Sequence, residues 1–502
     1  MEITAASRRV GIVLMLVCAC GGGGDQARGG RLPATDSAAS ATAMATGRKT
    51  ASGRISWEAD SSAGPIRNLG ETLDAVGWSV GLVSTVPFSH ATPACFAAHS
   101  PNRDDTHRIA DDLVRSGVAD LLIGAGNPRR DNPDRLEDAG YVSRQTYADL
   151  VAGIPGVVFV ERTRDVRADS LLASAVAGLD PDDGWRVVGL FGGPDGCMEP
   201  AVITGSADPP CARATLENPS LASAAVAALD FLARDDEGFF LLLEQGDIDW
   251  ANHDNDFAWL MGAMWQLEEA VAAVAAYVDT SAALDWDDTM VILTADHGCG
   301  CLRIGPPPGI LRGILPAQVS DSSGWTYPDG EVEFMTGTHT GELVSFRAAL
   351  PARVRPLADS LLGSPPAPGP GMLDNTHVFV LVTGAAAMED PVRHVILLIG
   401  DGMGPSCEAA AGAFLHGAAD GMLWDDPGLF PFSAWCTTWD VDAYDQRAAA
   451  AGAARFDPER FDPRIGYDPA LGGAGPSDAC SPYFLDPLPL PERGSDPGTV
   501  RD

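Results

Sequence analysis

Short apolar runs alternate along this chain with longer stretches in which apolar and polar residues follow a helical period. The runs cover residues 78–84, 119–123, 157–160, 187–190, 239–244, 290–295 and 394–400. Continuous apolar runs of this length are typical of strands that are buried on both faces. Helical stretches between such strands favour a mainly parallel sheet with helices packed on both sides. The pattern therefore predicts an α/β fold, a three-layer sandwich around a mainly parallel central sheet.

Polar residues follow three of these runs directly. Asp401 comes after residues 395–400, Glu244 after 239–243, and the pair Asp296-His297 after 291–295. In a parallel sheet, ligands bind beside the carboxyl ends of the strands. We therefore expect these side chains to meet at one edge of the sheet and to form a functional site there.

Composition limits the partners of such a site. The chain has 502 residues, of which 45% are hydrophobic, so it can bury a large core. Asp and Glu outnumber Lys and Arg by 69 to 33, which gives a formal net charge of -36. This excess disfavours nucleic acid and anionic membranes as partners held by charge. An anionic substrate would have to meet positive charge that the site itself supplies.

The N-terminal segment has the features of an export signal. Arg8 and Arg9 precede an apolar run over residues 10–19, and Cys20 follows it. Residues 17–20 resemble a bacterial lipobox, which predicts a signal peptide over 1–20 and lipid attachment at Cys20. The alternative is an ordinary cleaved signal. We expect a flexible linker over 21–32, a single folded domain over 33–502, and an exported protein that is periplasmic or anchored as a membrane lipoprotein.

Two of the ten cysteines, Cys18 and Cys20, lie in this segment, which leaves eight in the predicted domain. An even number in an exported chain permits disulfides. Cys197 and Cys211 form the best local pair. Cys299 and Cys301 could be interpreted as a metal site, but an isolated CxC lacks a second pair of ligands. We therefore expect disulfides there.

Residues 36–43 place Ser37 at the start of an alanine-rich helix. The first turn of a helix has free N–H groups and the positive end of the helix dipole, which suit a phosphate or an anionic oxygen. The alternative is that Asp36 or Ser37 only caps the helix. The metal-ligand residues elsewhere in the chain favour the first interpretation.

Three segments offer such ligands. Asp249 and His253 are four residues apart and share one face if that stretch is helical. Asp296 and His297 follow a predicted buried strand, and His339 lies between two threonines. Carboxylate oxygen and imidazole nitrogen are common zinc ligands. Together these segments predict a metal centre.

Five sequence segments resemble conserved stretches of one known family. They are DSAASATAMATGRKT, HVILLIGDGMG, FFLLLEQGDIDWANH, VILTADHG and GTHTGEL. Each resembles a segment of the alkaline phosphatase family, and together they span nearly all of residues 33–502. The resemblance implies an alkaline-phosphatase-like fold and hydrolysis of small phosphate monoesters.

The resemblance also implies two zinc ions and one magnesium ion. The first zinc would be held by Asp249, His253 and His339. The second would be held by Asp401, Asp296 and His297. Magnesium would be held by Asp401, Thr92 and Glu244.

The same resemblance assigns the catalytic residues. Ser37 would be the nucleophile that becomes phosphorylated, and Arg103 would clamp the phosphate, which the forked guanidinium suits. Asp36, His90 and Trp250 would lie just outside these residues. Family members also imply a homodimer.

The order of the segments departs from the family. There, the strand ending in the Asp401-type residue comes first, whereas here residues 391–502 come last and correspond to the family's N-terminal segment. This order predicts a circularly permuted chain, with residues 383–390 as the linker between the old ends. The alternative is a misassembled gene model.

Other functions remain open at this point. A related phosphodiesterase or sulfatase could use the same fold and paired metals, although Thr92 with Glu244 favours a monoesterase. The chain could also be an inactive surface protein that binds metal or phosphate, or a purely structural lipoprotein. The set of ligands disfavours both of these.

Overall fold

The computed structural model describes residues 34–129, 140–192, 196–198, 200–205, 207–306, 309–321, 324–363 and 371–466. The predicted signal peptide, Cys20 and the linker over 21–32 lie outside the described residues, as do Pro33 and Arg501, whose proximity a permuted order predicts. Among the helices of the described ranges, none is both long and apolar enough to span a bilayer.

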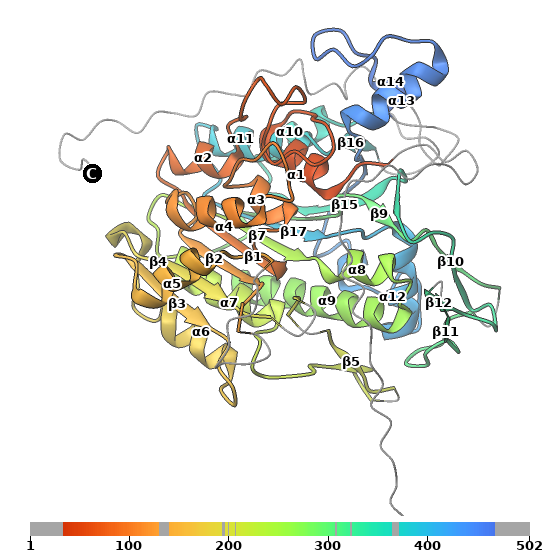
Figure 1. Ribbon diagram of the computed structural model, residues 1–502, viewed down its shortest axis with the longest axis horizontal. Helices are drawn as coiled ribbons and strands as arrows, with labels where there is room; N and C mark the ends of the chain where they lie inside the picture. The colour runs from red at the N-terminus through yellow and green to blue at the C-terminus, as the bar shows by residue number, and fades with distance from the viewer. Residues whose placement is uncertain are drawn as a thin grey trace, which may run out of the picture. The chain divides into compact units, whose positions relative to one another are not determined.

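A ten-stranded sheet forms the centre of the fold (Figure 1). Its order is β16-β18-β15-β8-β17-β7-β1-β2-β4-β3. The strands are β1 (Ser79–Pro87), β2 (Leu121–Ala125), β3 (Val157–Glu161), β4 (Arg186–Leu190), β7 (Phe239–Gln245), β8 (Thr289–Thr294), β15 (Val344–Ala349), β16 (Met372–Asp374), β17 (His394–Gly400) and β18 (Phe432–Thr437). Each of the seven predicted apolar runs coincides with one of these strands to within a few residues.

The sheet is mainly parallel, as predicted. β15 runs antiparallel to both of its neighbours, β8 and β18, and every other pairing in this sheet is parallel. Every residue of β1, β7, β8 and β17 is buried, so these strands are covered on both faces. This burial explains why they are continuous apolar runs rather than alternating ones.

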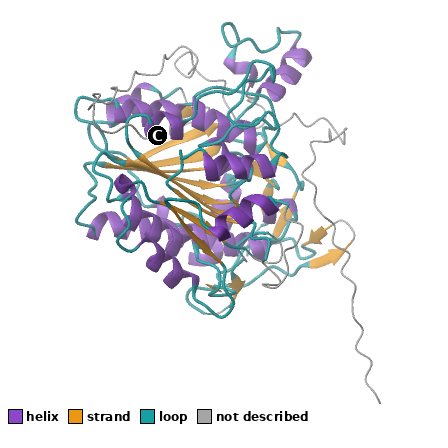
Figure 2. Cartoon of the chain, turned by 60° about the vertical axis from the view of Figure 1, so that its left-hand side comes forward, coloured by secondary structure: helices purple, strands orange, loops and turns teal. Residues whose placement is uncertain are grey.

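Helices cover both faces of the sheet and complete the three-layer sandwich (Figures 1 and 2). α1, α2, α3 and α11 lie on one face, and α7, α9 and α12 lie on the other. The helices are α1 (Ser37–Thr46), α2 (Leu69–Asp74), α3 (Ala91–Cys95), α4 (Thr106–Arg115), α5 (Arg144–Ala152), α6 (Ala168–Val176), α7 (Leu221–Leu232), α8 (Asp247–His253), α9 (Phe257–Thr280), α10 (Arg355–Ser360), α11 (His377–Ala386), α12 (Pro405–His416), α13 (Val441–Ala451) and α14 (Pro463–Gly466).

Short antiparallel ladders lie outside the main sheet. They pair β9 (Gly298–Cys299) with β14 (His339–Thr340), β10 (Leu302–Ile304) with β13 (Val332–Phe334), β11 (Val319–Asp321) with β12 (Gly324–Thr326), and β5 (Val202–Ile203) with β6 (Cys211–Ala212). The ladder of β9 and β14 matters most here, because it begins just after the end of β8 and carries His339.

β17 lies in the middle of the sheet although it comes late in the chain. It pairs in parallel with β7 on one side and with β8 on the other. Asp401 therefore follows β17 at the carboxyl edge, next to the residues that follow β7 and β8. The structure corrects the expected linker in one respect. α11 continues to Ala386, so the first half of residues 383–390 is helical, and residues 387–393 make the connection.

The predicted disulfides are wrong. Among the described residues no disulfide is formed, and Cys211, Cys299 and Cys301 carry thiols. Cys299 is held in β9, whereas Cys301 follows Gly300 in a turn with φ 47°, so the backbone does not bring the two together. Cys197 is followed by Met198, whose N–H donates to the Thr85 carbonyl, while Cys211 belongs to the separate ladder of β5 and β6.

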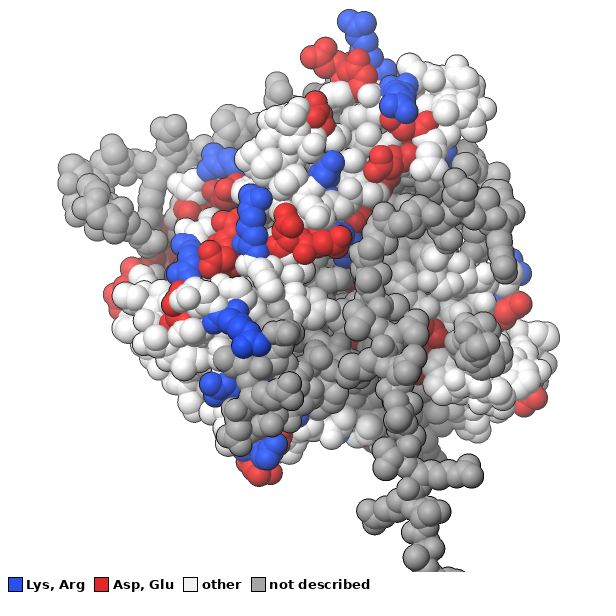
Figure 3. All heavy atoms as spheres, in the orientation of Figure 1, with Lys and Arg blue, Asp and Glu red and all other residues white. Residues whose placement is uncertain are grey.

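Acidic and basic side chains lie next to one another on the described part of the face in Figure 3. Ion pairs among the exposed described residues include Arg115 with Asp111 at 2.5 Å and with Asp149 at 2.6 Å. Such pairs contribute little to stability because water screens them.

Candidate active site and metal centre

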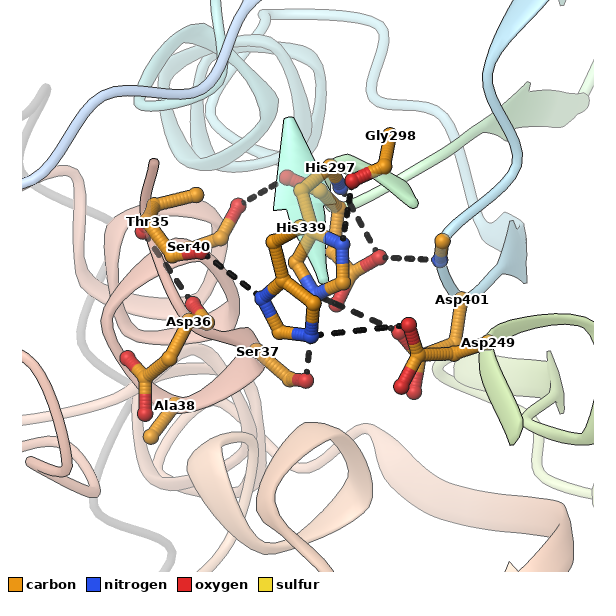
Figure 4. A network of polar contacts seen from close by, with 12 residues as sticks. Thr35, Asp36, Ser37, Ala38, Ser40, Asp249, His297, Gly298, His339 and Asp401 are labelled. Carbon is orange, nitrogen blue, oxygen red and sulfur yellow. Dashed lines mark hydrogen bonds and ion pairs between the residues drawn. The ribbon is translucent and has the colours of Figure 1, made fainter. Parts of the chain in front are cut away.

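Ser37 is the first residue of α1, as the sequence predicts. The carboxylate of Asp36 caps the helix, with Oδ1 accepting from the Ala39 N–H at 2.9 Å and Oδ2 from the Gly53 N–H at 3.0 Å. The capping alternative therefore holds for Asp36, which leaves the Ser37 hydroxyl available for chemistry. That hydroxyl is buried, and its Oγ lies 3.2 Å from Nε2 of His297 (Figure 4).

The first predicted zinc ligands converge on one point. Asp249 and His253 lie on α8 and His339 lies on β14. His253 Nε2 is 3.2 Å from Asp249 Oδ2, and His339 Nε2 is 3.5 Å from Asp249 Oδ1. The four-residue spacing places the first two ligands on one face of a helix, as expected.

The two imidazoles of this group are oriented as metal ligands are. His253 Nδ1 lies 2.8 Å from the Gly337 carbonyl, and His339 Nδ1 lies 2.9 Å from the Thr35 carbonyl. A carbonyl only accepts, so each Nδ1 carries the proton and each Nε2 presents a lone pair. These Nε2 atoms are 3.1 Å apart. Two lone pairs at that distance repel each other unless a metal ion or an added proton lies at this point.

The second predicted group surrounds His297. Its Nε2 lies 3.3 Å from Asp296 Oδ2 and 3.4 Å from Asp401 Oδ1. Its Nδ1 lies 3.3 Å from the Gly298 carbonyl, which again directs Nε2 into the cluster (Figure 4). Asp296 follows β8 and Asp401 follows β17, so the parallel pairing of these strands brings the two carboxylates together. All three side chains are fully buried.

The third predicted group lies beside the second. Glu244 in β7 and Thr92 in α3 are both fully buried, and Thr92 is close enough to lower the pKa of Glu244. Glu244 also accepts a hydrogen bond from the Ser84 hydroxyl. Glu244 Oε1, Thr92 Oγ1 and both carboxylate oxygens of Asp401 have no hydrogen-bond partner among the described residues. Buried oxygens left in this way are costly unless a cation binds them.

The electrostatics of these carboxylates also favour a bound cation. Burial, together with the charges of Asp296 and Asp247, raises the pKa of Glu244 to about 7, although Ser84 and Thr92 lower it. Burial and the neighbouring carboxylates Asp296, Asp249 and Glu244 raise the pKa of Asp401 well above its ordinary value.

The pKa values of the other two carboxyl groups of the metal centre are shifted in opposite directions. Burial and the charge of Asp249 raise the pKa of Asp296 to about 6. Burial also opposes ionisation of Asp249, but the charges of His253 and His339 outweigh it and hold this pKa well below its ordinary value. The same attraction outweighs burial at His253, whose pKa rises to about 9, so a proton binds here when no metal ion does. Oxygen and imidazole donors in this arrangement fit zinc, and the all-oxygen third group fits magnesium.

Arg103 lies at the N-terminal end of α1. One guanidinium nitrogen is 2.9 Å from Asp36 Oδ2, and another is 3.3 Å from His90 Nε2. The His90 ring contacts Trp250 edge to face at 6.0 Å. Burial and the nearby charge of Arg103 lower the pKa of His90 to about 3, so this ring is neutral at ordinary pH. The structure thus brings every predicted site residue into one region.

The sequence matches known proteins in a way that decides the family. The chain is 31% identical over 399 residues to the streptomycin-6-phosphate phosphatase of Streptomyces griseus, an alignment that covers 72% of this chain and 80% of that protein. A sequence profile described as alkaline phosphatase matches residues 26–142 and 190–313. The chain belongs to the alkaline phosphatase family.

Other family members are similar over shorter stretches. The chain is 33% identical over 281 residues to alkaline phosphatase 3 of Bacillus subtilis, covering 54% of this chain and 50% of that protein. It thus spans about half the length of that relative. A solved structure of a cold-active alkaline phosphatase from a Shewanella species is 25% identical, with a TM-score of 0.47 over 63% of this chain and 80% of that one.

One candidate ligand, Cys299, is not in the ligand sets that the sequence predicts. Cys299 lies with Asp249, His253 and His339 in a group whose ligand atoms are all within 4.8 Å of one another. The pairing of β9 with β14 places Cys299 directly opposite His339. The signal was present in the sequence, because Cys299 follows the predicted ligand His297 by two residues. The neighbouring Cys301 favours a disulfide instead, and the structure does not form it.

Proposed function

We propose that this chain is a metal-dependent phosphomonoesterase, an alkaline phosphatase that hydrolyses small phosphate monoesters through a phosphoserine at Ser37. One observation carries the proposal. The Ser37 hydroxyl, held at the positive end of α1, lies against a cluster of imidazole nitrogens and buried carboxylate oxygens. Several of these oxygens receive no hydrogen bond from the described residues.

In the proposed reaction, Ser37 Oγ attacks the phosphorus of the ester. The Oγ–P bond forms, the bond from phosphorus to the ester oxygen breaks, and the alcohol leaves with a proton. Water then attacks the phosphoserine, which releases inorganic phosphate and restores the Ser37 hydroxyl. Two in-line displacements in sequence predict overall retention at phosphorus.

The residues of the chain position the substrate for this step. The N–H groups at the start of α1 and the Arg103 guanidinium offer hydrogen bonds to phosphate oxygens on the side of Ser37. Asp36 holds Arg103 at that end of the helix through the 2.9 Å ion pair. Two zinc ions and one magnesium ion, held by the three ligand groups, would neutralise the phosphate and lower the pKa values of the serine hydroxyl and of the attacking water.

The proposed ligand sets are those implied by the family resemblance. Asp249, His253 and His339 would hold the first zinc ion. Asp401, Asp296 and His297 would hold the second, and Asp401, Thr92 and Glu244 would hold magnesium. The third group supports a monoesterase rather than a phosphodiesterase or a sulfatase.

Three p-nitrophenyl esters test the function. We expect the purified chain to hydrolyse p-nitrophenyl phosphate far faster than bis(p-nitrophenyl) phosphate or p-nitrophenyl sulfate. A chelator should abolish turnover, and zinc with magnesium should restore it. Preference for the bis-ester or the sulfate would refute the monoesterase. Absence of turnover on all three, with metal bound, would favour the inactive binding protein.

Location and assembly are proposed on the sequence alone. Export, lipid attachment at Cys20 and a homodimer follow from the N-terminal segment and from the family resemblance. The circularly permuted order is likewise proposed, and the central position of β17 supports it. Labelling with a radioactive fatty acid, compared between the chain and Cys20→Ser, tests the anchor.

A further inference from the structure

The side-chain groups around the Cys299 sulfur differ from the hydrogen-bond partners of two other described thiols, Cys95 and Cys407. Cys95 contacts the Thr42 hydroxyl at 3.3 Å, and Cys407 contacts the Asn252 side chain at 3.6 Å, both neutral partners. The sulfur of Cys299 instead lies within 4.8 Å of ligand atoms from one carboxylate, Asp249, and two imidazoles. A buried cysteine that serves only as a small apolar residue packs against apolar neighbours.

The backbone fixes Cys299 beside this group. β9 pairs antiparallel with β14, and the register sets Cys299 against His339 and Gly298 against Thr340. Residues directly opposite in such a pair have neighbouring side chains on one face. Cys299 is 1% exposed, so its sulfur meets the protein interior rather than solvent. The ladder therefore delivers a fourth ligand atom where three ligands already converge.

We propose that the Cys299 sulfur is a fourth ligand of the zinc ion held by Asp249, His253 and His339. This inference rests on the proposed function, because it assumes that the three-residue group binds zinc. Sulfur, nitrogen and oxygen donors together suit zinc, whereas magnesium and calcium prefer oxygen alone. Cys299 would therefore increase both the selectivity of this site for zinc and its retention of zinc.

A sulfur ligand also changes what the site can do. Three protein ligands leave one position on zinc open for water or substrate, whereas four complete a tetrahedral set. Zinc can accommodate a fifth ligand during a reaction. Cys299 is thus proposed to stabilise the resting state of this site rather than to take part in the displacement at phosphorus.

The test replaces zinc with cobalt(II) in the full chain and records near-ultraviolet absorption. A thiolate bound to cobalt gives a strong charge-transfer band that oxygen and nitrogen ligands do not give. We expect the band in the unaltered chain and in Cys301→Ser, a matched control two residues away, and its loss in Cys299→Ser. A bound cobalt ion without the band in the unaltered chain would overturn the proposal.

A second measurement needs no variant, in case Cys299→Ser folds poorly. X-ray absorption of the zinc-loaded unaltered chain should show a sulfur neighbour at about 2.3 Å, and a spectrum with only oxygen and nitrogen neighbours contradicts the proposal. If Cys299→Ser folds, it should lose zinc to a chelator at least about tenfold more readily, since even outer partners of ligands contribute that much.

These measurements separate the two proposals. A sulfur signal without hydrolysis of p-nitrophenyl phosphate refutes the proposed function and leaves the Cys299 ligand in place. Hydrolysis without a sulfur signal refutes the Cys299 ligand and leaves the proposed function in place.

Discussion

Two charged clusters contact α1, and their charges are balanced in different ways. The first, here called the lysine cluster, contains Lys49, Asp374, Asn375, Thr376 and Thr437. The second, here called the ligand cluster, contains the three predicted metal groups. The lysine cluster is almost completely removed from water, and so are the carboxylates and His297 of the ligand cluster, whereas the His253 side chain is 34% exposed and that of His339 17%.

The lysine cluster satisfies its own charges. Lys49 Nζ lies 3.1 Å from Asp374 Oδ1, and it donates to Asn375 Oδ1 at 2.6 Å. The hydroxyls of Thr376 and Thr437 each donate to the Asp374 carboxylate at 2.7 Å. Burial opposes ionisation of Asp374, but the charge of Lys49 outweighs it and lowers the pKa of this carboxyl. A buried ion pair is tolerated when additional hydrogen bonds complete it in this way.

The carboxylates of the ligand cluster are not completed by hydrogen bonds in this way. Both oxygens of Asp401, Oδ2 of Asp296 and Oε1 of Glu244 have no hydrogen-bond partner among the described residues. Burial raises the pKa values of Asp401, Asp296 and Glu244, and the neighbouring carboxylates raise them further. Both clusters bury charge, so burial of charge does not distinguish them. What distinguishes the ligand cluster is that, among the described residues, its buried Asp401 carboxylate is not neutralised by a neighbouring cation or by hydrogen bonds.

The largest expected effect is a loss of activity on changing Ser37, which lies beside the ligand cluster. Ser37→Ala should reduce turnover of p-nitrophenyl phosphate by roughly 10⁴-fold, since it removes the nucleophile. Metal content, measured by elemental analysis, should stay the same because Ser37 is not a principal ligand. Full activity in the purified variant would exclude Ser37 as the nucleophile.

The next effect is on stability, which a substitution in the lysine cluster should lower and one in the ligand cluster should not. Asp374→Asn should lower the free energy of unfolding by roughly 3–5 kcal/mol, since it removes the carboxylate that lies 3.1 Å from the buried Lys49 ammonium. Asp401→Asn, measured in the presence of chelator, should not destabilise the chain, because it removes one of several carboxylates that repel one another. Denaturant unfolding of both variants provides the measurement, and equal destabilisation by the two would contradict the comparison.

Arg103→Ala should have a smaller effect on activity than Ser37→Ala. We expect a loss of about 10²-fold in kcat/KM, since the metal ions still hold the phosphate when the guanidinium is gone. Arg103→Lys, which keeps the charge but not the fork, should recover part of this loss. A loss as large as that of Ser37→Ala would show that Arg103 has a different role.

The smallest expected effect is a pH dependence that only the chelated chain shows. The folded-state pKa values of Asp296, about 6, and Glu244, about 7, lie above the ordinary values of 3.8 and 4.5. Their contribution to stability is therefore fully present below about pH 4 and is lost as the pH rises through 6 and 7.

The metal-loaded chain should not show this loss, because bound cations favour the ionised carboxylates. The Asp374 carboxyl should add nothing over the same window, since its pKa is lowered and it is already ionised at pH 4 and above. Thermal unfolding from pH 4 to 8, with and without chelator, tests this. A melting temperature that falls equally in both samples would exclude the ligand cluster as the cause.

Local pattern alone was enough to predict much of the molecule. The strands buried on both faces could be found because each is a continuous apolar run, and β17 was predicted over the same residues, 394–400, that the structure assigns to it. The start of α1 was predictable because Asp36 is a good cap and alanine favours a helix. The spacing of Asp249 and His253 also needed only the helical period.

The tertiary structure decided which of these segments meet. Asp401 and Asp296 are adjacent because β17 pairs with β8, and no local signal specifies that pairing. The sequence places Cys299 only beside Cys301, which favours a disulfide, whereas the ladder of β9 and β14 sets it opposite His339. Periodicity records which face of an element is buried, but contacts between distant elements depend on strand order and register, which are properties of the packed sheet.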